Sequence, residues 1–238
     1  MSAAAFSGNG SMRLIERPSP NHGPRLGDGV VDILVLHYTG MRSAGAALEL
    51  LCDPAAQVSA HYLIAQDGTV HRMVAEDRRA WHAGRSWWQG ETDVNSRSIG
   101  IELENPGHYW GYVPFPAAQM ATLVALCTGV LARHPIPPGR VVGHSDIAPR
   151  RKQDPGELFD WPALAQAGIG RWPPALDLPA PDAPPFPAEE GMARLAALGY
   201  ELDDPAATVT AFQRRYRPAV VDGRLDAETL WRIARLAP

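Results

Sequence analysis

The sequence predicts an α/β fold: a mixed central β-sheet flanked by helices, with a metal site at one edge of the sheet, and a small three-helix domain at the C-terminus. Three observations predict it. The run 30–36 is apolar almost throughout, as in a strand buried on both faces. Apolar residues recur with a 3.6-residue period between 120 and 131, which is typical of a helix facing a core. A segment rich in proline and alanine, 173–188, then precedes three shorter helical patterns.

The remaining elements follow from local signals. Asp67-Gly68 predicts the tight turn of a hairpin, because this pair favours the turn that joins two antiparallel strands. Pro116 fits the first turn of the long helix, where a missing N–H has no cost. In chain order we expect a helix near 44–51, hairpin strands at 61–65 and 69–73, strands at 98–104 and 141–142, a short helix from Trp161, a helix ending at Gly199 and two more helices on either side of a turn at Asp222-Gly223.

Two strand ends carry side chains that bind metals. His37 follows the apolar run 30–36, and His144 follows Val141-Val142, with Asp154 a short loop further on. If the two strands lie parallel in one sheet, their carboxyl ends share one edge. Two histidines and a carboxylate with one open position are a catalytic zinc arrangement. The alternative stays open at this point, because a histidine at a strand end is often only a hydrogen-bonded structural residue.

Glu102 is a further candidate. In the segment 98–105, Glu102 and Glu104 share one face of a strand while Ile101 and Leu103 take the other. An acid on a buried strand needs a partner or a task, and next to a metal it could accept a proton from water. A solvated acidic face on an edge strand explains the same pattern.

The sequence resembles the zinc-dependent N-acetylmuramoyl-L-alanine amidases of the type-2 amidase family, in the AmpD and AmiD branch. The blocks that carry the resemblance stand in family order: LHYT at 36–39, SAHYLI at 59–64, RAWHAG at 79–84, SIGIELEN at 98–105 and FDW at 159–161. The resemblance implies Zn²⁺ held by His37, His144 and Asp154, with Glu102 as catalytic acid and base and Lys152 as the cationic helper. It implies hydrolysis of the amide between N-acetylmuramic acid, or its 1,6-anhydro form, and L-alanine, in cell-wall recycling.

A tryptophan-rich segment suggests where substrate binds. Trp81 and His82 pair an aromatic face with a polar neighbour, which suits a groove for the sugar or the stem peptide, although such tryptophans are also ordinary core or lid residues. Asn95 matches a family position, and we expect it to contact substrate. The partners predicted are peptidoglycan fragments or the intact sacculus.

The C-terminal part resembles the helical peptidoglycan-binding module of cell-wall hydrolases, in LGY at 198–200, AFQRRYRP at 211–218 and DGRLDAET at 222–229. It would hold the enzyme on glycan, or simply pack on the catalytic domain. The domains expected are therefore an N-terminal extension at 1–29, the catalytic domain at 30–172, the linker at 173–188 and the helical domain at 189–238.

Composition limits which partners the protein can bind and in which compartment we expect it. A net charge of −4 without a basic cluster argues against nucleic acid, and no apolar stretch reaches the roughly 20 residues of a membrane span. Residues 1–11 show neither a leader nor a lipid-attachment cysteine, so we expect a cytoplasmic monomer, with the periplasm as the alternative. Cys52 and Cys127 both fit buried thiols rather than a disulfide. Two competing functions are a recognition protein that only binds peptidoglycan and a metallo-peptidase that cuts within the stem peptide.

Overall fold

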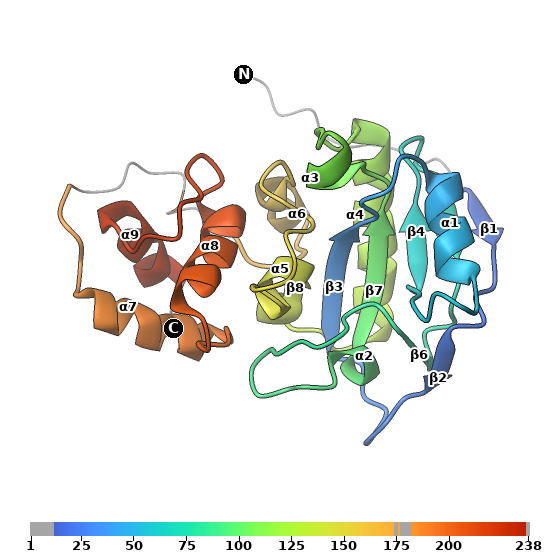
Figure 1. Ribbon diagram of the computed structural model, residues 1–238, viewed down its shortest axis with the longest axis horizontal. Helices are drawn as coiled ribbons and strands as arrows, with labels where there is room; N and C mark the ends of the chain where they lie inside the picture. The colour runs from blue at the N-terminus through green and yellow to red at the C-terminus, as the bar shows by residue number, and fades with distance from the viewer. Residues whose placement is uncertain (1–11, 174–175, 177–181, 237–238) are drawn as a thin grey trace.

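A six-stranded mixed sheet forms the centre of the protein (Figure 1). The computed structural model describes residues 12–173, 176 and 182–236. The strand order is β1-β5-β4-β7-β3-β8, where β4 and β5 pair antiparallel and every other neighbouring pair is parallel. The bounds are β1 Leu14–Glu16, β3 Ile33–Tyr38, β4 Tyr62–Ile64, β5 Val70–Arg72, β7 Ser98–Leu103 and β8 Val141–Gly143. The mixed α/β class predicted from the sequence is confirmed.

Helices cover both faces of this sheet, and a small second sheet pairs β2 (His22–Pro24) with β6 (Arg78–Ala80). The helices are α1 Ala44–Cys52, α2 Val94–Arg97, α3 Gly107–Trp110, α4 Ala117–Arg133, the 3-10 turn η1 Pro138–Arg140, α5 His144–Ile147, α6 Trp161–Gln166, α7 Ala188–Leu198, α8 Pro205–Tyr216 and α9 Ala227–Leu236. Pro116 is the N-cap of α4, and Gly199 is the C-cap of α7, as the sequence predicted. None of the helices described is long and apolar enough to cross a bilayer.

Strand β3 shows how the sheet is buried. Its residues alternate between two cores: Leu34 and Leu36 lie in the core that includes α4 residues, whereas Ile33 and Val35 lie in a second core on the other face. His37 continues the Ile33–Val35 side of the strand, because side chains alternate with a period of two. The same alternation places Ser98, Gly100 and Glu102 of β7 on the His37 side, since the register pairs His37 with Glu102.

The hairpin turn behaves as the Asp-Gly pair predicts. Gly68 has a φ of +87°, a left-handed conformation that glycine adopts without strain. The carboxylate of Asp67 accepts the backbone N–H of Thr69 at 2.8 Å, which closes the turn. A Cβ at position 68 would also lie 2.8 Å from Thr122 Oγ1 on α4, so glycine is required here for space as well.

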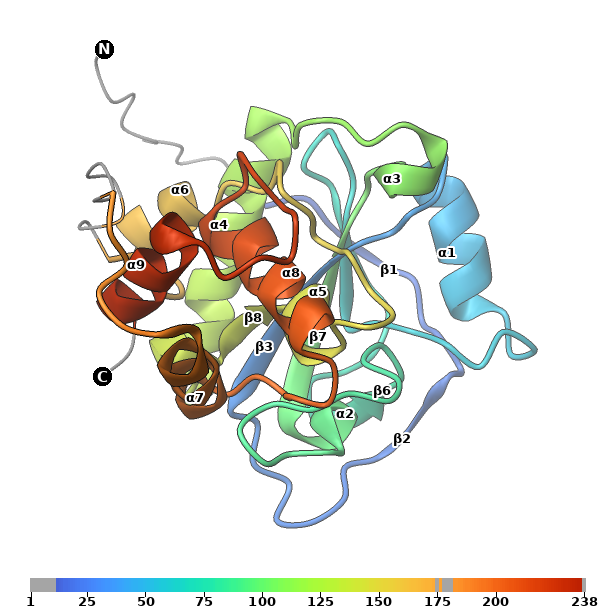
Figure 2. The ribbon, with the colours of Figure 1, turned by 60° about the vertical axis from the view of Figure 1, so that its left-hand side comes forward.

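The three C-terminal helices lie on the β8 side of the sheet, where α8 packs against α5 (Figure 1). Phe212 of α8 and Ile233 of α9 belong to the same buried core as Ile33, Val35 and Val142 of the sheet. Figure 2 shows α8 lying beside α5 and β8, in agreement with the contacts between α5 and α8. These helices therefore share a core with the sheet instead of enclosing a separate one.

The regions that flank the predicted catalytic domain are partly described. Residues 12–29, predicted as an extension, supply β1 at the edge of the main sheet and β2 of the small one. Much of the predicted linker lies outside the described residues. Both cysteines are free thiols; Cys127 is buried, and Cys52 is half-buried.

Candidate metal centre

Three side chains from two strands and a loop meet at the carboxyl edge of the sheet. His37 leaves β3, His144 begins α5 directly after β8, and Asp154 follows in the next loop. Their ligand atoms form a triangle: 2.9 Å between the two Nδ1 atoms, 3.1 Å from His37 Nδ1 to Asp154 Oδ2, and 3.0 Å from His144 Nδ1 to the same oxygen. All three residues are buried. Strands β3 and β8 pair parallel, which was the condition for a shared edge, and this pairing brings the three residues together.

Hydrogen bonds at Nε2, the ring nitrogen of His37 that faces away from the cluster, determine which of its two nitrogens carries the proton. The Ser98 hydroxyl donates to Val94 O at 2.6 Å, so its oxygen accepts from His82 Nε2 at 3.1 Å. His82 Nδ1 is then an acceptor, to which the N–H of His37 Nε2 donates at 3.0 Å. Because a neutral imidazole carries one proton, the network assigns a free lone pair to His37 Nδ1.

His144 is oriented in the same way. Its Nε2 donates to the carbonyl of Ala83 at 3.1 Å, which leaves the lone pair of Nδ1 facing that of His37. Two lone pairs and a carboxylate at about 3 Å from one another repel unless a cation lies among them. The three residues together could hold one metal ion, and their chemistry fits a zinc ion, whose bonds of about 2.0–2.2 Å to nitrogen and oxygen separate tetrahedral ligands by little more than these distances.

The electrostatics favour the ligand forms of these groups. Burial, and then the neighbouring His144, lower the pKa of His37 to about 4, so this ring is neutral at neutral pH. Burial alone would raise the pKa of Asp154, but the two histidines hold it well below its usual range. A neutral imidazole and an ionised carboxylate are the forms that bind a metal.

Glu102 lies beside this cluster with a free oxygen. It lines a cavity of about 370 Å³ together with His144, Lys152 and Asp154. Its Oε2 is buried without a hydrogen-bond partner among the described residues. Burial, and then the Asp154 carboxylate, raise the pKa of Glu102 well above its usual range, while Lys152 opposes the shift. A carboxyl group that holds its proton more tightly than a free one, next to a possible metal site, is suited to proton exchange.

The alternative interpretation of Glu102 as a solvated edge residue is wrong. Strand β7 lies between β4 and β3 in the middle of the sheet, so neither of its sides is an edge. The other acid on this side of the strand, Glu104, accepts the backbone N–H groups of Ala44 and Gln66 and so joins α1 to the hairpin.

The predicted substrate-binding residues line a groove of about 410 Å³ next to the cluster. Trp81 is half-buried on the groove wall. Asn95 is buried, and its Oδ1 accepts the backbone N–H groups of His82 and Ala83 at 3.0 and 2.8 Å, which shapes the loop. The His82 ring lies directly over Gly100, where a Cβ would be 2.5 Å from the ring. That His82 holds the His37 ring could not be seen from the tryptophan-rich segment around it. The small residues at 98 and 100 were the one signal in the sequence, because they leave space for a ring to pack over β7.

The C-terminal helices hold the turn that carries His144. Asp146 of α5 accepts from Gly143 N and from Arg215 Nη1 of α8, both at 2.8 Å, and from the hydroxyl of Tyr200 at 2.7 Å. The carboxylate and the guanidinium are both nearly inaccessible to solvent. A buried charge is tolerated only where partners surround it, so this network fixes the start of α5. Sequence reasoning missed it, because 69 residues separate the two charges.

This fold and this site define a class: metal-dependent hydrolases with a two-histidine, one-aspartate cluster and an adjacent acid at the carboxyl edge of a sheet. Residues 27–157 match the family Amidase_2, N-acetylmuramoyl-L-alanine amidase. This is more than half of the 238 residues, and the chain belongs to that family. The family and the enzyme class predicted from the sequence are confirmed.

Similar proteins agree with this assignment. The chain is 39% identical over 222 residues to the N-acetylmuramoyl-L-alanine amidase AmiD of Escherichia coli, covering 84% of this chain and 79% of that protein. It superposes with a TM-score of 0.78 and 37% identity on AmiD from E. coli in complex with the substrate anhydro-N-acetylmuramic acid-L-Ala-D-γ-Glu-L-Lys, over 92% and 91% of the two chains. AmpDh3 from Pseudomonas aeruginosa in complex with anhydromuramic pentapeptide aligns with a TM-score of 0.77 and 31% identity, over 99% and 98%.

Proposed function

We propose that the protein hydrolyses the amide between N-acetylmuramic acid, or its 1,6-anhydro form, and L-alanine in peptidoglycan or muropeptides, in cell-wall turnover and recycling. The observation that carries the proposal is the meeting of His37, His144 and Asp154 beside a cavity lined by Glu102, whose buried Oε2 has no hydrogen-bond partner among the described residues. The anhydromuramyl peptides bound in the AmiD and AmpDh3 structures support this substrate class.

Zinc is the metal proposed for His37, His144 and Asp154. Two imidazoles and one carboxylate are a donor set that zinc prefers, and calcium or magnesium would select oxygen ligands. A zinc ion bound there supplies a Lewis acid that polarises the substrate carbonyl and acidifies water.

Glu102 and Lys152 are proposed to carry the proton and charge movements. Glu102 takes the proton of the attacking water as a C–O bond forms at the carbonyl carbon. It returns a proton to the nitrogen as the C–N bond breaks, which releases the lactyl carboxylate and a peptide with a free L-alanyl amine. The Lys152 ammonium stabilises negative charge on the carbonyl oxygen. The cavity that both residues line supports these roles.

Trp81, His82 and Asn95 are proposed to form the substrate groove. All three line the space next to the metal cluster, and Trp81 is the most exposed of them. Its indole offers an apolar face to a sugar ring or a peptide. His82 and Asn95 are nearly buried, so the shape that they give to the loop is their larger contribution.

The division into domains is also a proposal. It places an N-terminal extension at 1–29, the catalytic domain at 30–172, the linker at 173–188 and a peptidoglycan-binding-like domain at 189–238. The core shared with the sheet supports a packing role for the C-terminal helices. A monomer acting on peptidoglycan fragments in the cytoplasm, with the periplasm as the alternative, stays a prediction from the sequence.

A defined muropeptide tests the reaction. Anhydro-N-acetylmuramic acid-L-Ala-D-γ-Glu-L-Lys is incubated with protein, and the products are weighed by mass spectrometry. We expect the free sugar acid and the intact tripeptide, loss of turnover with a chelator, and recovery with zinc. Glu102→Gln is the matched control, expected to keep the metal and lose turnover by at least about 10²-fold. Cleavage within the peptide would instead identify a metallo-peptidase, and binding without cleavage a recognition protein.

A further inference from the structure

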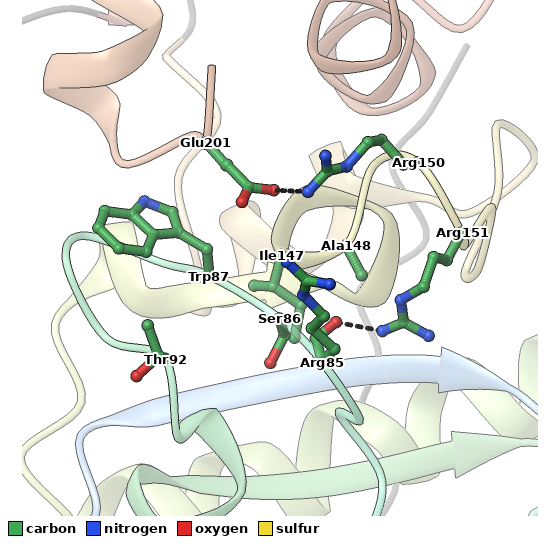
Figure 3. Close-up of a pocket in the computed structure, with 9 residues that line it drawn as sticks. All are labelled: Arg85, Ser86, Trp87, Thr92, Ile147, Ala148, Arg150, Arg151 and Glu201. Atoms are coloured by element: carbon green, nitrogen blue, oxygen red, sulfur yellow. Dashed lines mark hydrogen bonds and ion pairs between the residues drawn. The ribbon is translucent and has the colours of Figure 1, made fainter. Parts of the chain in front are cut away.

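A second cavity lies between the loop 85–92, the end of α5 and the segment that joins α7 to α8 (Figure 3). Its volume is about 390 Å³. Arg150 and Arg151 stand on one side and Trp87 on the other, with Arg85 between them and Glu201 closing the top of the view.

The cavity is cationic in a chain that is acidic as a whole. Its lining holds three arginines and one glutamate, a formal charge of +2, whereas the chain carries −4. Arg85 is exposed, and its guanidinium has no hydrogen bond or ion pair with any residue that the structure describes. Arg150 pairs with Glu201 at 3.1 Å and with Asp203 at 3.4 Å, so Arg85 is the guanidinium of this cavity that is free to bind an anion. An unpaired guanidinium facing a cavity is suited to binding an anion.

Arg151 connects this cavity to the metal centre. It lines the second cavity, the groove with Trp81, and the space that contains Glu102 and Asp154, so the three cavities adjoin at its side chain. Its Nη2 donates to the carbonyls of Ala83 and Arg85, and it has no acidic partner in the described part of the chain.

The backbone around Arg151 is built for this arrangement. Gly84 has a φ of +58°, and a Cβ there would lie 3.3 Å from Arg151 Nη2, so a larger residue would be strained and would crowd the guanidinium. The backbone N–H of Trp87 donates to Ile147 O at 2.8 Å, which ties the loop to α5. The cations are therefore presented from a wall fixed to the element that carries His144.

We propose that this cavity binds the free carboxylates on the peptide side of the substrate. The inference rests on the proposed function. The sugar side of the scissile bond is uncharged, because the lactyl carboxyl group is consumed in the amide. A γ-linked D-glutamate keeps its α-carboxylate free, and the peptide ends in a second carboxylate, so the anions lie only on the peptide side. The cationic cavity thus orients the stem peptide past Arg151 toward Arg85 and Arg150, where the Trp87 indole covers its apolar parts.

Two substrates that differ only in charge test the proposal. One is anhydro-N-acetylmuramic acid-L-Ala-D-γ-Glu-L-Lys, and the other is its diamide, with both free carboxylates converted to carboxamides. In Arg85→Gln and Arg150→Gln we expect kcat/KM for the acid to fall about fivefold each, equivalent to about 1 kcal/mol, through KM. The diamide should be cleaved equally by variants and wild type. Arg194→Gln on α7, outside the cavity, is the matched control.

Binding of the product peptide gives a readout without turnover. L-Ala-D-γ-Glu-L-Lys is titrated into wild type and Arg85→Gln by calorimetry at low and high salt. We expect weaker binding in the variant, and a weakening of binding by salt that the diamide peptide, which keeps only its two ammonium groups, does not show. Equal losses on both substrates, or peptide binding unchanged in the variants, would overturn the proposal while leaving the amidase in place. A wild type that cleaves neither substrate refutes the proposed function instead, and the titration still decides whether the cavity binds carboxylates.

Discussion

Replacement of His82 by leucine removes the acceptor that holds the proton of His37 Nε2. In the wild type this proton lies in a bond of 3.0 Å, and the His37 side chain is 1% exposed, so water cannot replace the lost partner. An unsatisfied buried donor costs about 1–3 kcal/mol. The ring can relieve that cost by moving its proton to Nδ1, the atom that faces the cluster.

The affinity of the site for a metal falls as a result, because a protonated Nδ1 cannot bind a cation. We therefore expect the zinc affinity of His82→Leu to fall by about 10–100-fold, or about 1.4–2.7 kcal/mol. His82→Gln is the conservative variant: its amide accepts with one atom and donates with the other, so it should regain part of the affinity.

Competition with a chromophoric chelator measures the zinc affinity of each variant, and the absorption spectrum of the cobalt-substituted protein reports ligand geometry. Gly100→Ala perturbs the same ring from below, since its Cβ would lie 2.5 Å from His82 Cγ, and we expect it to weaken zinc in the same direction. Thermal unfolding monitors whether each variant folds. Folded His82→Leu protein that binds zinc within twofold of wild type would refute the assigned proton arrangement.

Three further predictions concern charge. Lys152→Met should lower kcat by about 10²–10³-fold and leave the zinc content measured by mass spectrometry unchanged; a loss of zinc would contradict its role at the carbonyl oxygen. Arg215→Met leaves Asp146 as an unpaired buried carboxylate and should lower the free energy of unfolding in urea by about 3–5 kcal/mol, whereas a neutral effect would mean that the pair fixes nothing. Burial would raise the pKa of Glu76, but hydrogen bonds, of which that from Arg133 is the strongest, lower it to about 2. The ionised carboxylate therefore stabilises the folded protein by about 1–3 kcal/mol after solvent screening; this contribution is present above about pH 4.5 and is lost as the pH falls toward 2. Glu76→Gln should remove this pH dependence of the free energy of unfolding.

The sequence revealed the parts of the site that depend on local patterns. His37 and His144 follow apolar runs that are typical of buried strands, and the parallel pairing of these strands, which the sequence could only assume, places both residues at one edge. Alternation placed Glu102 on one face of its strand, and the structure adds that this face is the one with His37. The hairpin and the long helix were predictable from Asp67-Gly68 and Pro116, because a turn and a helix start each need only a few neighbouring residues.

The parts that escaped depend on residues far apart in the chain. The function of His82 depends on Ser98 and on the space above Gly100, neither of which its own neighbours reveal. The bond from Arg215 to Asp146 joins a C-terminal helix to the metal loop, and periodicity cannot specify which charges pair across such a distance. The short strands β1 and β2 lack the length that makes an alternating pattern visible.

The core that the sheet shares with the C-terminal helices limits how parts of this enzyme can be exchanged with parts of other proteins. Removal of the residues after the proline-rich segment would take Phe212 and Ile233 out of the core that contains Ile33, Val35 and Val142, and would leave Asp146 without its cation. In a chimera whose last fifty residues come from another protein, those residues must therefore supply a matching hydrophobic surface and an arginine. Otherwise the catalytic part will aggregate before its activity can be assayed.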